Sequence, residues 1–151
     1  MAVPNAKDEL YRAYPVVVAQ AVAWGDMDSY QHVNNVVYFR YFENARIEYI
    51  RRIGWIELEQ ATGIGPILAS TQARFRRALT FPDTIHIGMR LLEMKDDRFT
   101  FEHQIVSEKL GDIATVGAGL LVAYHYATNQ KVALPDELKT RIRALEAQAP
   151  G

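Results

Sequence analysis

A change of hydrophobic periodicity constrains the fold of this chain more than any other feature. From about Asn34 to Ile53, apolar residues recur at helical spacing, and Gly54 follows at the position of a C-terminal cap. Beyond residue 67 the period changes to two, which is typical of half-buried antiparallel strands. Because the apolar arc of the helical segment is broad, we expect the strands to wrap around that helix.

The remaining segments complete this architecture. We expect strands at about 15–24, 67–76, 84–91, 98–105 and 113–127, a surface helix at 135–147, and short polar tails. Hairpin-length turns at 95–97 and 110–112 separate successive strands, and Gly117 and Gly119 permit a bend in the last one. The sequence therefore predicts an α+β fold, in which a curled five-stranded antiparallel sheet, with its last four strands meandering, closes around one long central helix.

Composition narrows the function classes. A length of 151 residues fits a single domain over 1–151, and a formal net charge of -1 provides no overall basic field for nucleic acid. The absence of cysteine excludes disulfides, thiolate nucleophiles and Cys-ligated zinc. The N-terminus lacks a secretory pattern and no apolar run approaches the roughly 20 residues that span a membrane. We expect a cytoplasmic protein with no membrane partner.

Side chains that can take part in catalysis cluster immediately before the predicted helix. Residues 26–35 bring two carboxylates, an imidazole and two amides to its N-terminus. The free backbone N–H groups there, together with the positive end of the helix dipole, polarise a carbonyl or hold an oxyanion. A nearby carboxylate acts as a base or a nucleophile. These residues predict one half of an active site.

Several motifs together support a resemblance to a known family. They are Trp-Gly-Asp-Met-Asp at 24–28, His-Val-Asn-Asn at 32–35, the helical segment 38–46, and the segments 67–70 and 74–79. The chain resembles, over roughly residues 15–128, the 4-hydroxybenzoyl-CoA thioesterase-like acyl-CoA thioesterases of the hot-dog fold. The resemblance implies the wrapped-helix sheet described above, with sites between subunits that pair through sheet edges.

The resemblance also implies roles for individual residues. Asp28 takes the catalytic position, either attacking the thioester carbonyl or activating water, and the backbone N–H of Asn35 or a neighbour polarises that carbonyl. No metal or cofactor is required. Asp26 is expected to hold the turn. His32 either orients Asp28 or a water molecule, or makes a structural hydrogen bond. Its role is open because the related plant thioesterases carry an Asn where this chain has Tyr30.

Substrate contacts have structural alternatives. Arg74 and Arg76 share one face by strand parity and either bind the phosphates of coenzyme A or form a solvated face. Lys95 and Arg98 are alternative phosphate contacts. Tyr38 and two phenylalanines near it either line an acyl tunnel or pack in the core. His103 falls on the apolar face of its strand, which favours a core or interface position.

The sequence therefore predicts an acyl-CoA thioesterase that releases a free acid and coenzyme A. The expected partners are an acyl-CoA substrate and further copies of the chain, as a dimer or tetramer, with no nucleic acid. Two alternatives remain open: an acyl-carrier-protein thioesterase, and a non-catalytic acyl-CoA-binding protein of the same fold.

Overall fold

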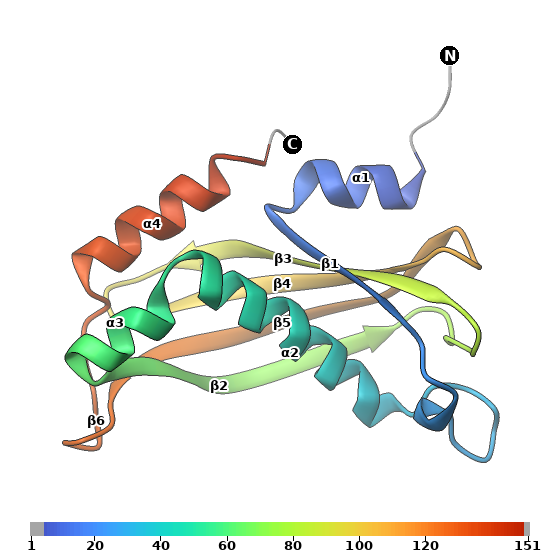
Figure 1. The fold of residues 1–151 in the computed structure, drawn as a ribbon, viewed down its shortest axis with the longest axis horizontal. Helices are drawn as coiled ribbons and strands as arrows, with labels where there is room; N and C mark the ends of the chain where they lie inside the picture. The colour runs from blue at the N-terminus through green and yellow to red at the C-terminus, as the bar shows by residue number, and fades with distance from the viewer. Residues whose placement is uncertain (1–4, 150–151) are drawn as a thin grey trace.

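The computed structural model describes residues 5–149. Its sheet has the order β1-β3-β4-β5-β2, with β6 paired to β5, and every pairing is antiparallel. Helix α2 runs diagonally along this sheet (Figure 1). The elements in chain order are α1 (Ala6–Ala13), β1 (Val16–Ala21), η1 (Trp24–Asp26), α2 (Asn35–Arg52), α3 (Trp55–Thr62), β2 (Ile64–Phe75), β3 (Thr84–Met94), β4 (Arg98–Ser107), β5 (Asp112–His125), β6 (Gln130–Lys131) and α4 (Asp136–Glu146).

The hot-dog architecture predicted from the sequence is confirmed, with two corrections: the short strand β6 adds a sixth strand to the predicted five, and the strand order differs. Strands β3, β4 and β5 form a meander, but β2 pairs with β5 at the far edge of the sheet and not with β3. The long predicted helix corresponds to α2, which Asn34 caps by accepting the N–H of Val36 at 3.1 Å. Gly54 follows this helix with φ of 71°, as a C-terminal signal requires.

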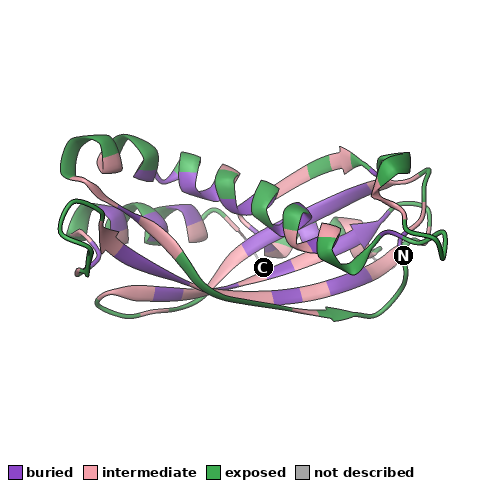
Figure 2. Ribbon diagram, turned by 90° about the horizontal axis from the view of Figure 1, so that it is seen from below, coloured by how far each residue is buried: buried purple, intermediate pink, exposed green. Residues whose placement is uncertain are grey.

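The core lies between α2 and the inner face of the sheet, where buried residues gather (Figure 2). On β3, Ile85, Ile87 and Met89 are fully buried, as their alternation predicted. Gly117 was expected to permit a bend in β5, but in the structure it leaves room for a core side chain. A Cβ atom at residue 117 would lie 2.4 Å from the ring of Phe42, so the glycine admits the aromatic ring of α2.

The alternation predicted for β2 is correct only beyond a β-bulge. The register of β2 against β5 shifts between Leu68 and Ser70, so that Leu68 and Thr71 both face α2 while Ile67 faces the outer side. The predicted grouping of Ile67 with Thr71 on one face is therefore wrong. Most of β2 is exposed or half-buried, because it forms one edge of the sheet (Figure 2).

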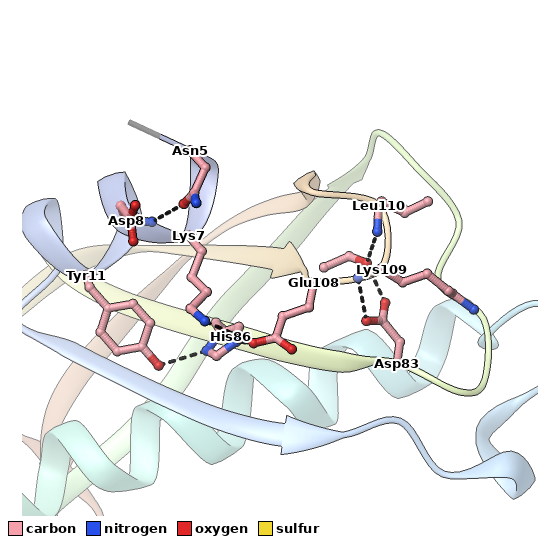
Figure 3. Close-up of polar contacts among 10 residues, drawn as sticks. Asn5, Lys7, Asp8, Tyr11, Asp83, His86, Glu108, Lys109 and Leu110 are labelled. Carbon is pink, nitrogen blue, oxygen red and sulfur yellow. Dashed lines mark hydrogen bonds and ion pairs between the residues drawn. The ribbon is translucent and has the colours of Figure 1, made fainter. Parts of the chain in front are cut away.

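Helix α1 was not predicted and covers the outer face of the sheet. Its Leu10 packs with Tyr14 and Val106 in a second cluster, against the outer side of Gly88. The Tyr11 hydroxyl lies 2.8 Å from His86 Nδ1, and Glu108 Oε1 lies 2.9 Å from His86 Nε2 and 3.1 Å from Lys7 Nζ (Figure 3). These contacts fasten α1 to β3 and to the β4–β5 turn. The segment assigned to a polar tail is thus part of the fold.

The other two helices close the opposite end of the molecule. Helix α3 was not predicted, and its Trp55 is fully buried and donates its indole N–H to Ile64 O at 3.1 Å. Helix α4 was predicted, but as a surface element. It packs Leu138, Ile142 and Leu145 into the main core, so it covers the core rather than standing on the surface.

Candidate active site

A tight loop holds the polar residues ahead of α2. Met27 and Val33 form an antiparallel bridge, and the Asp28 N–H donates to His32 O at 2.9 Å. Gln31 has a left-handed φ of 61°, which lets its N–H donate to Asp28 O at 2.9 Å. The loop therefore fixes the backbone of Asp28 beside the first turn of the helix.

Asp26 anchors this loop to α2, as predicted. Its Oδ2 accepts hydrogen bonds from the Tyr41 hydroxyl at 2.9 Å and from the Ala23 N–H at 3.3 Å. Burial and the neighbouring carboxylate raise the pKa of Tyr41, so its hydroxyl stays a donor. The structural role predicted for Asp26 is confirmed.

Asp28 keeps one carboxylate oxygen free. Its side chain is exposed, and Oδ1 accepts the Tyr30 N–H at 2.9 Å. Within residues 5–149, Oδ2 of Asp28 has no hydrogen-bond partner, and the Asn35 N–H has no acceptor. The other N–H groups of that first turn are used, because Val36 donates to the Asn34 side chain and Val37 to Asn34 O.

Asp28 and Asn35 line the same hollow, whose volume is about 280 Å³. The hollow is lined by Asp28, Tyr30, His32, Val33, Asn35, Tyr38, Phe75, Arg76, Arg77 and Ala78. Two hydrogen bonds hold the segment after β2 against the loop: Val33 N–H donates to Leu79 O at 2.8 Å, and Leu79 N–H to the Tyr38 hydroxyl at 3.0 Å. The hollow is therefore a fixed feature of the fold.

His32 and Tyr38 both line this hollow. The His32 side chain is exposed and makes no hydrogen bond to the Asp28 side chain, so these two residues do not form a hydrogen-bonded dyad. Tyr38 is almost fully buried, and its ring packs edge-on against Phe75 at a centroid distance of 4.9 Å. Tyr38 is thus a core residue that also forms part of the wall.

The arginines after β2 divide between two hollows. Arg74 and Arg76 both line a second hollow of about 490 Å³ on the outer face of the sheet, in agreement with their predicted shared face. Arg76 also reaches the hollow of Asp28, where it is joined by Arg77. Arg77 pairs with Asp112 at 3.3 Å, whereas Arg76 has no carboxylate partner within residues 5–149. Of the two arginines that line the hollow of Asp28, Arg76 is therefore the one without a carboxylate partner within residues 5–149.

Lys95 and Arg98 are not brought to this site within one chain. Ala21, just before the Asp28 loop, pairs with Thr84 at the start of β3, and Lys95 follows the opposite end of that strand. Eleven residues of strand span about 35 Å. Arg98 also pairs with its neighbour Asp97 at 2.8 Å. The alternative phosphate contacts thus lie at the other end of the sheet.

The sequence did not predict an aromatic hollow on the other side of Asp28. It has a volume of about 440 Å³ and includes Trp24, whose side chain is 71% exposed, and Phe81, 43% exposed. The remaining lining residues are Met27, Asp28, Gln31 and Thr80. Trp24 belongs to the same motif as Asp28, and its aromatic side chain was the available signal. Phe81 lies in the long connection before β3, which carries no periodicity.

The arrangement suits attack on a carbonyl group. Asp28, which has an unpaired carboxylate oxygen within residues 5–149, and Asn35, which has an unpaired N–H at the helix N-terminus, both line a hollow open to solvent. The N–H can stabilise an oxyanion while the carboxylate attacks or removes a proton from water. No group of three or more His, Cys, Asp or Glu residues within 5–149 is arranged to hold a metal ion. None of the helices in this part of the chain combines the length and hydropathy needed to cross a membrane.

Comparisons with known proteins point to one family. Residues 22–142 match the model of the thioesterase-like superfamily. Protein THEM6 of Danio rerio is 30% identical over 105 residues, covering 66% of this chain but 52% of that protein, so the chain spans about half the length of this relative. Long-chain acyl-CoA thioesterase FadM of Escherichia coli is 23% identical over 119 residues, covering 79% of this chain and 90% of the enzyme. The crystal structure of a thioesterase from Thermus thermophilus, complexed with coenzyme A and Zn, has 31% identity and a TM-score of 0.79, covering 89% of this chain and 96% of the other.

Proposed function

The chain belongs to the thioesterase-like superfamily, and we propose that it hydrolyses acyl-CoA thioesters to a free acid and coenzyme A at Asp28. One observation carries the proposal: within residues 5–149, Asp28 has an unpaired carboxylate oxygen, Asn35 has an unpaired N–H, and both residues line the same hollow. The names of relatives support the substrate class, since one is a long-chain acyl-CoA thioesterase and another was crystallised with coenzyme A.

The proposed reaction begins with the thioester carbonyl oxygen at the Asn35 N–H. In the general-base form, Asp28 takes a proton from water as the water oxygen bonds to the carbonyl carbon. The N–H stabilises the oxyanion, which then collapses with cleavage of the C–S bond, and the proton passes to the leaving thiolate. In the nucleophilic form, the carboxylate itself bonds to that carbon, and the C–S bond breaks with release of the coenzyme A thiolate. Water then hydrolyses the resulting anhydride, which gives the free acid and restores the Asp28 carboxylate. His32, on the rim of the hollow, is proposed to position water.

A thiol-release assay tests the proposal. Acyl-CoAs of short, long, branched and aromatic acyl groups are offered to the wild-type chain, together with a matched acyl-carrier-protein thioester. We expect turnover with at least one acyl-CoA. A preference for the carrier-protein thioester would favour that alternative, and tight acyl-CoA binding without turnover would favour the non-catalytic alternative and contradict the proposed function.

Arg76 is proposed to bind the phosphates of coenzyme A. It is the cation without a carboxylate partner that reaches both the hollow of Asp28 and the outer hollow. Because a contact to a remote part of the substrate is equally strong in ground and transition states, Arg76→Gln should raise KM about fivefold, with little change in kcat. The effect should grow at low ionic strength, where exposed charges are poorly screened.

The control for Arg76 separates phosphate binding from general damage. Hydrolysis of an N-acetylcysteamine thioester, which carries no phosphates, should be unchanged in Arg76→Gln. Arg74→Gln removes the same charge but only from the outer hollow, so its effect on KM should be smaller. Equal losses on both thioesters would contradict the phosphate contact.

A further inference from the structure

Arg46 is a buried cation whose hydrogen-bonding capacity is unused. Only 7% of this residue is exposed, and its guanidinium makes no hydrogen bond to any residue within 5–149. Its nearest carboxylate oxygen, on Glu43, is 3.8 Å away, and the guanidinium lies over the ring of Phe101 at 6.0 Å. Burial lowers the pKa of Arg46, with Glu43 opposing this shift. A guanidinium carries five N–H donors and remains charged in proteins, so a mostly buried one with a single long ion pair and no hydrogen bond is incompletely satisfied.

The guanidinium belongs to a groove of about 280 Å³ between α2 and the edge strand β2. The groove is lined by Val36, Phe39, Arg40, Glu43, Arg46, Leu68 and Thr71. Three of its lining side chains are apolar and four are polar or charged. Two of the apolar ones are strongly exposed for their type, Val36 at 73% and Leu68 at 37%. The β-bulge of β2 contributes to this surface, because it turns both Leu68 and Thr71 toward α2. The groove therefore combines three apolar side chains with a mostly buried cation.

The groove and the proposed reaction centre lie along the same helix, α2, and share no lining residue. Asn35, Phe39 and Arg46 are spaced i, i+4 and i+11, which places them on one face of α2. Asn35 to Arg46 spans about 16 Å at 1.5 Å per residue. Helix side chains lean toward the N-terminus, so the guanidinium of Arg46 lies closer to the Asn35 N–H than the Arg46 backbone does. The remaining distance corresponds to a chain of roughly six to eight carbons.

Resting on the proposed thioesterase function, we propose that Arg46 selects acyl groups that end in a carboxylate, the mono-CoA thioesters of medium-length dicarboxylic acids. The carbonyl lies at the Asn35 N–H, the methylene chain runs past Phe39, and the distal carboxylate meets the guanidinium. Arginine binds a carboxylate with two parallel hydrogen bonds, and these would replace the long ion pair between Arg46 and Glu43. Glu43, whose side chain is 59% exposed, turns to solvent when the ligand arrives.

Paired substrates test this selectivity. We measure kcat/KM for hexanedioyl-CoA against hexanoyl-CoA, and for octanedioyl-CoA against octanoyl-CoA. In the wild type the diacid should be preferred at one of these lengths. Arg46→Met should lower the diacid-to-monoacid ratio at that length by roughly tenfold, the loss expected for a charged hydrogen bond. Arg51→Met removes one charge from the same helix outside the groove and should leave the ratio unchanged.

A binding measurement keeps the inference testable apart from turnover. Octanedioate should raise the melting temperature of the wild type more than octanoate does, and Arg46→Lys, which keeps the charge but not the planar pair of donors, should reduce that difference. This result would support the Arg46 site even if no thioester were hydrolysed. A lack of hydrolysis would count against the proposed thioesterase function alone. The inference would be overturned if folded Arg46→Met kept the wild-type diacid-to-monoacid ratio of kcat/KM, or if the substitution changed only the oligomeric state. Arg46 would then be a structural cation.

Discussion

His103 illustrates how the fold sets the charge of a single residue. It is fully buried on β4, its Nδ1 donates to Gly88 O at 2.9 Å, and its ring stacks on Phe42 at a centroid distance of 4.8 Å. Burial lowers the pKa of His103 to about 3, against the opposing effect of the Gly88 hydrogen bond. The core position predicted for this histidine is confirmed.

The depressed pKa of His103 predicts an acid sensitivity. The unfolded chain binds this proton below about pH 6.5, whereas the folded protein does not until about pH 3. The stability contributed by the neutral imidazole is therefore complete above pH 6.5 and falls as pH decreases through that window. The free energy of unfolding of the wild type should fall more steeply than that of His103→Phe, by up to about 1.4 kcal/mol per pH unit. Denaturant titrations of both proteins between pH 4 and 7 measure the two slopes, and equal slopes would rule out the buried neutral histidine.

At the scale of elements, a single close approach fixes the packing of α2 on β5. A Cβ atom on residue 117 would lie 2.4 Å from Phe42 and 3.0 Å from Gln72 O, so Gly117→Ala forces the helix or the strand to move. We expect a loss of about 1–3 kcal/mol in the free energy of unfolding, typical of an overpacked core. Gly25→Ala is the matched control, since a Cβ atom there meets nothing within 4 Å. Chemical denaturation compares the two variants, and equal stability would contradict the packing constraint.

The elements also show which sequence signals predict this fold. Helix α2 and strands β3, β4 and β5 were predicted from long, strongly periodic segments. Each buries one face along its whole length, so apolar residues recur at regular spacing in its sequence. Helix α1 lacked such a pattern, since only Leu10 of its eight residues is buried. Its capping signal was present, because Asn5 accepts the Asp8 N–H at 2.8 Å. The β-bulge in β2 has no sequence signature and reversed the predicted face of Ile67.

For the whole molecule, the sheet ends in an exposed edge that calls for a partner. Strand β2 is 12 residues long and largely exposed, and unpaired edges of this length invite pairing. Leu68 and Phe75, 37% and 41% exposed, lie along this strand. We expect at least a dimer, formed through β2, as the sequence also predicted. Multi-angle light scattering at micromolar concentration should give a mass of two or more chains, and a fully active monomer would contradict the expectation.

The candidate site shows the limit of sequence reasoning at this same scale. The motif before α2 predicted Asp28, Asn35 and His32 as site residues, which is possible because they are neighbours in the chain, and the structure brings all three to one hollow. Contacts between distant segments were harder to predict: Arg76 reaches this hollow, but Lys95 and Arg98 lie at the other end of the sheet. The burial of Arg46 was not predicted, because the sequence of a helix does not show whether the guanidinium of one of its arginines is buried.

The central claim is that Asp28 acts directly on the thioester, and one measurement tests it most directly. Steady-state hydrolysis of the best acyl-CoA is compared in the wild type, Asp28→Asn and Asp96→Asn, with acyl-CoA binding measured separately for each. Asp96 is an exposed carboxylate, far from Asp28 at the β3–β4 turn, and its replacement should leave kcat unchanged. Asp28→Asn keeps the shape of the side chain but loses the base or nucleophile, so kcat should fall at least about a hundredfold while the dissociation constant changes little. A kcat near the wild-type value in folded Asp28→Asn would contradict the assignment.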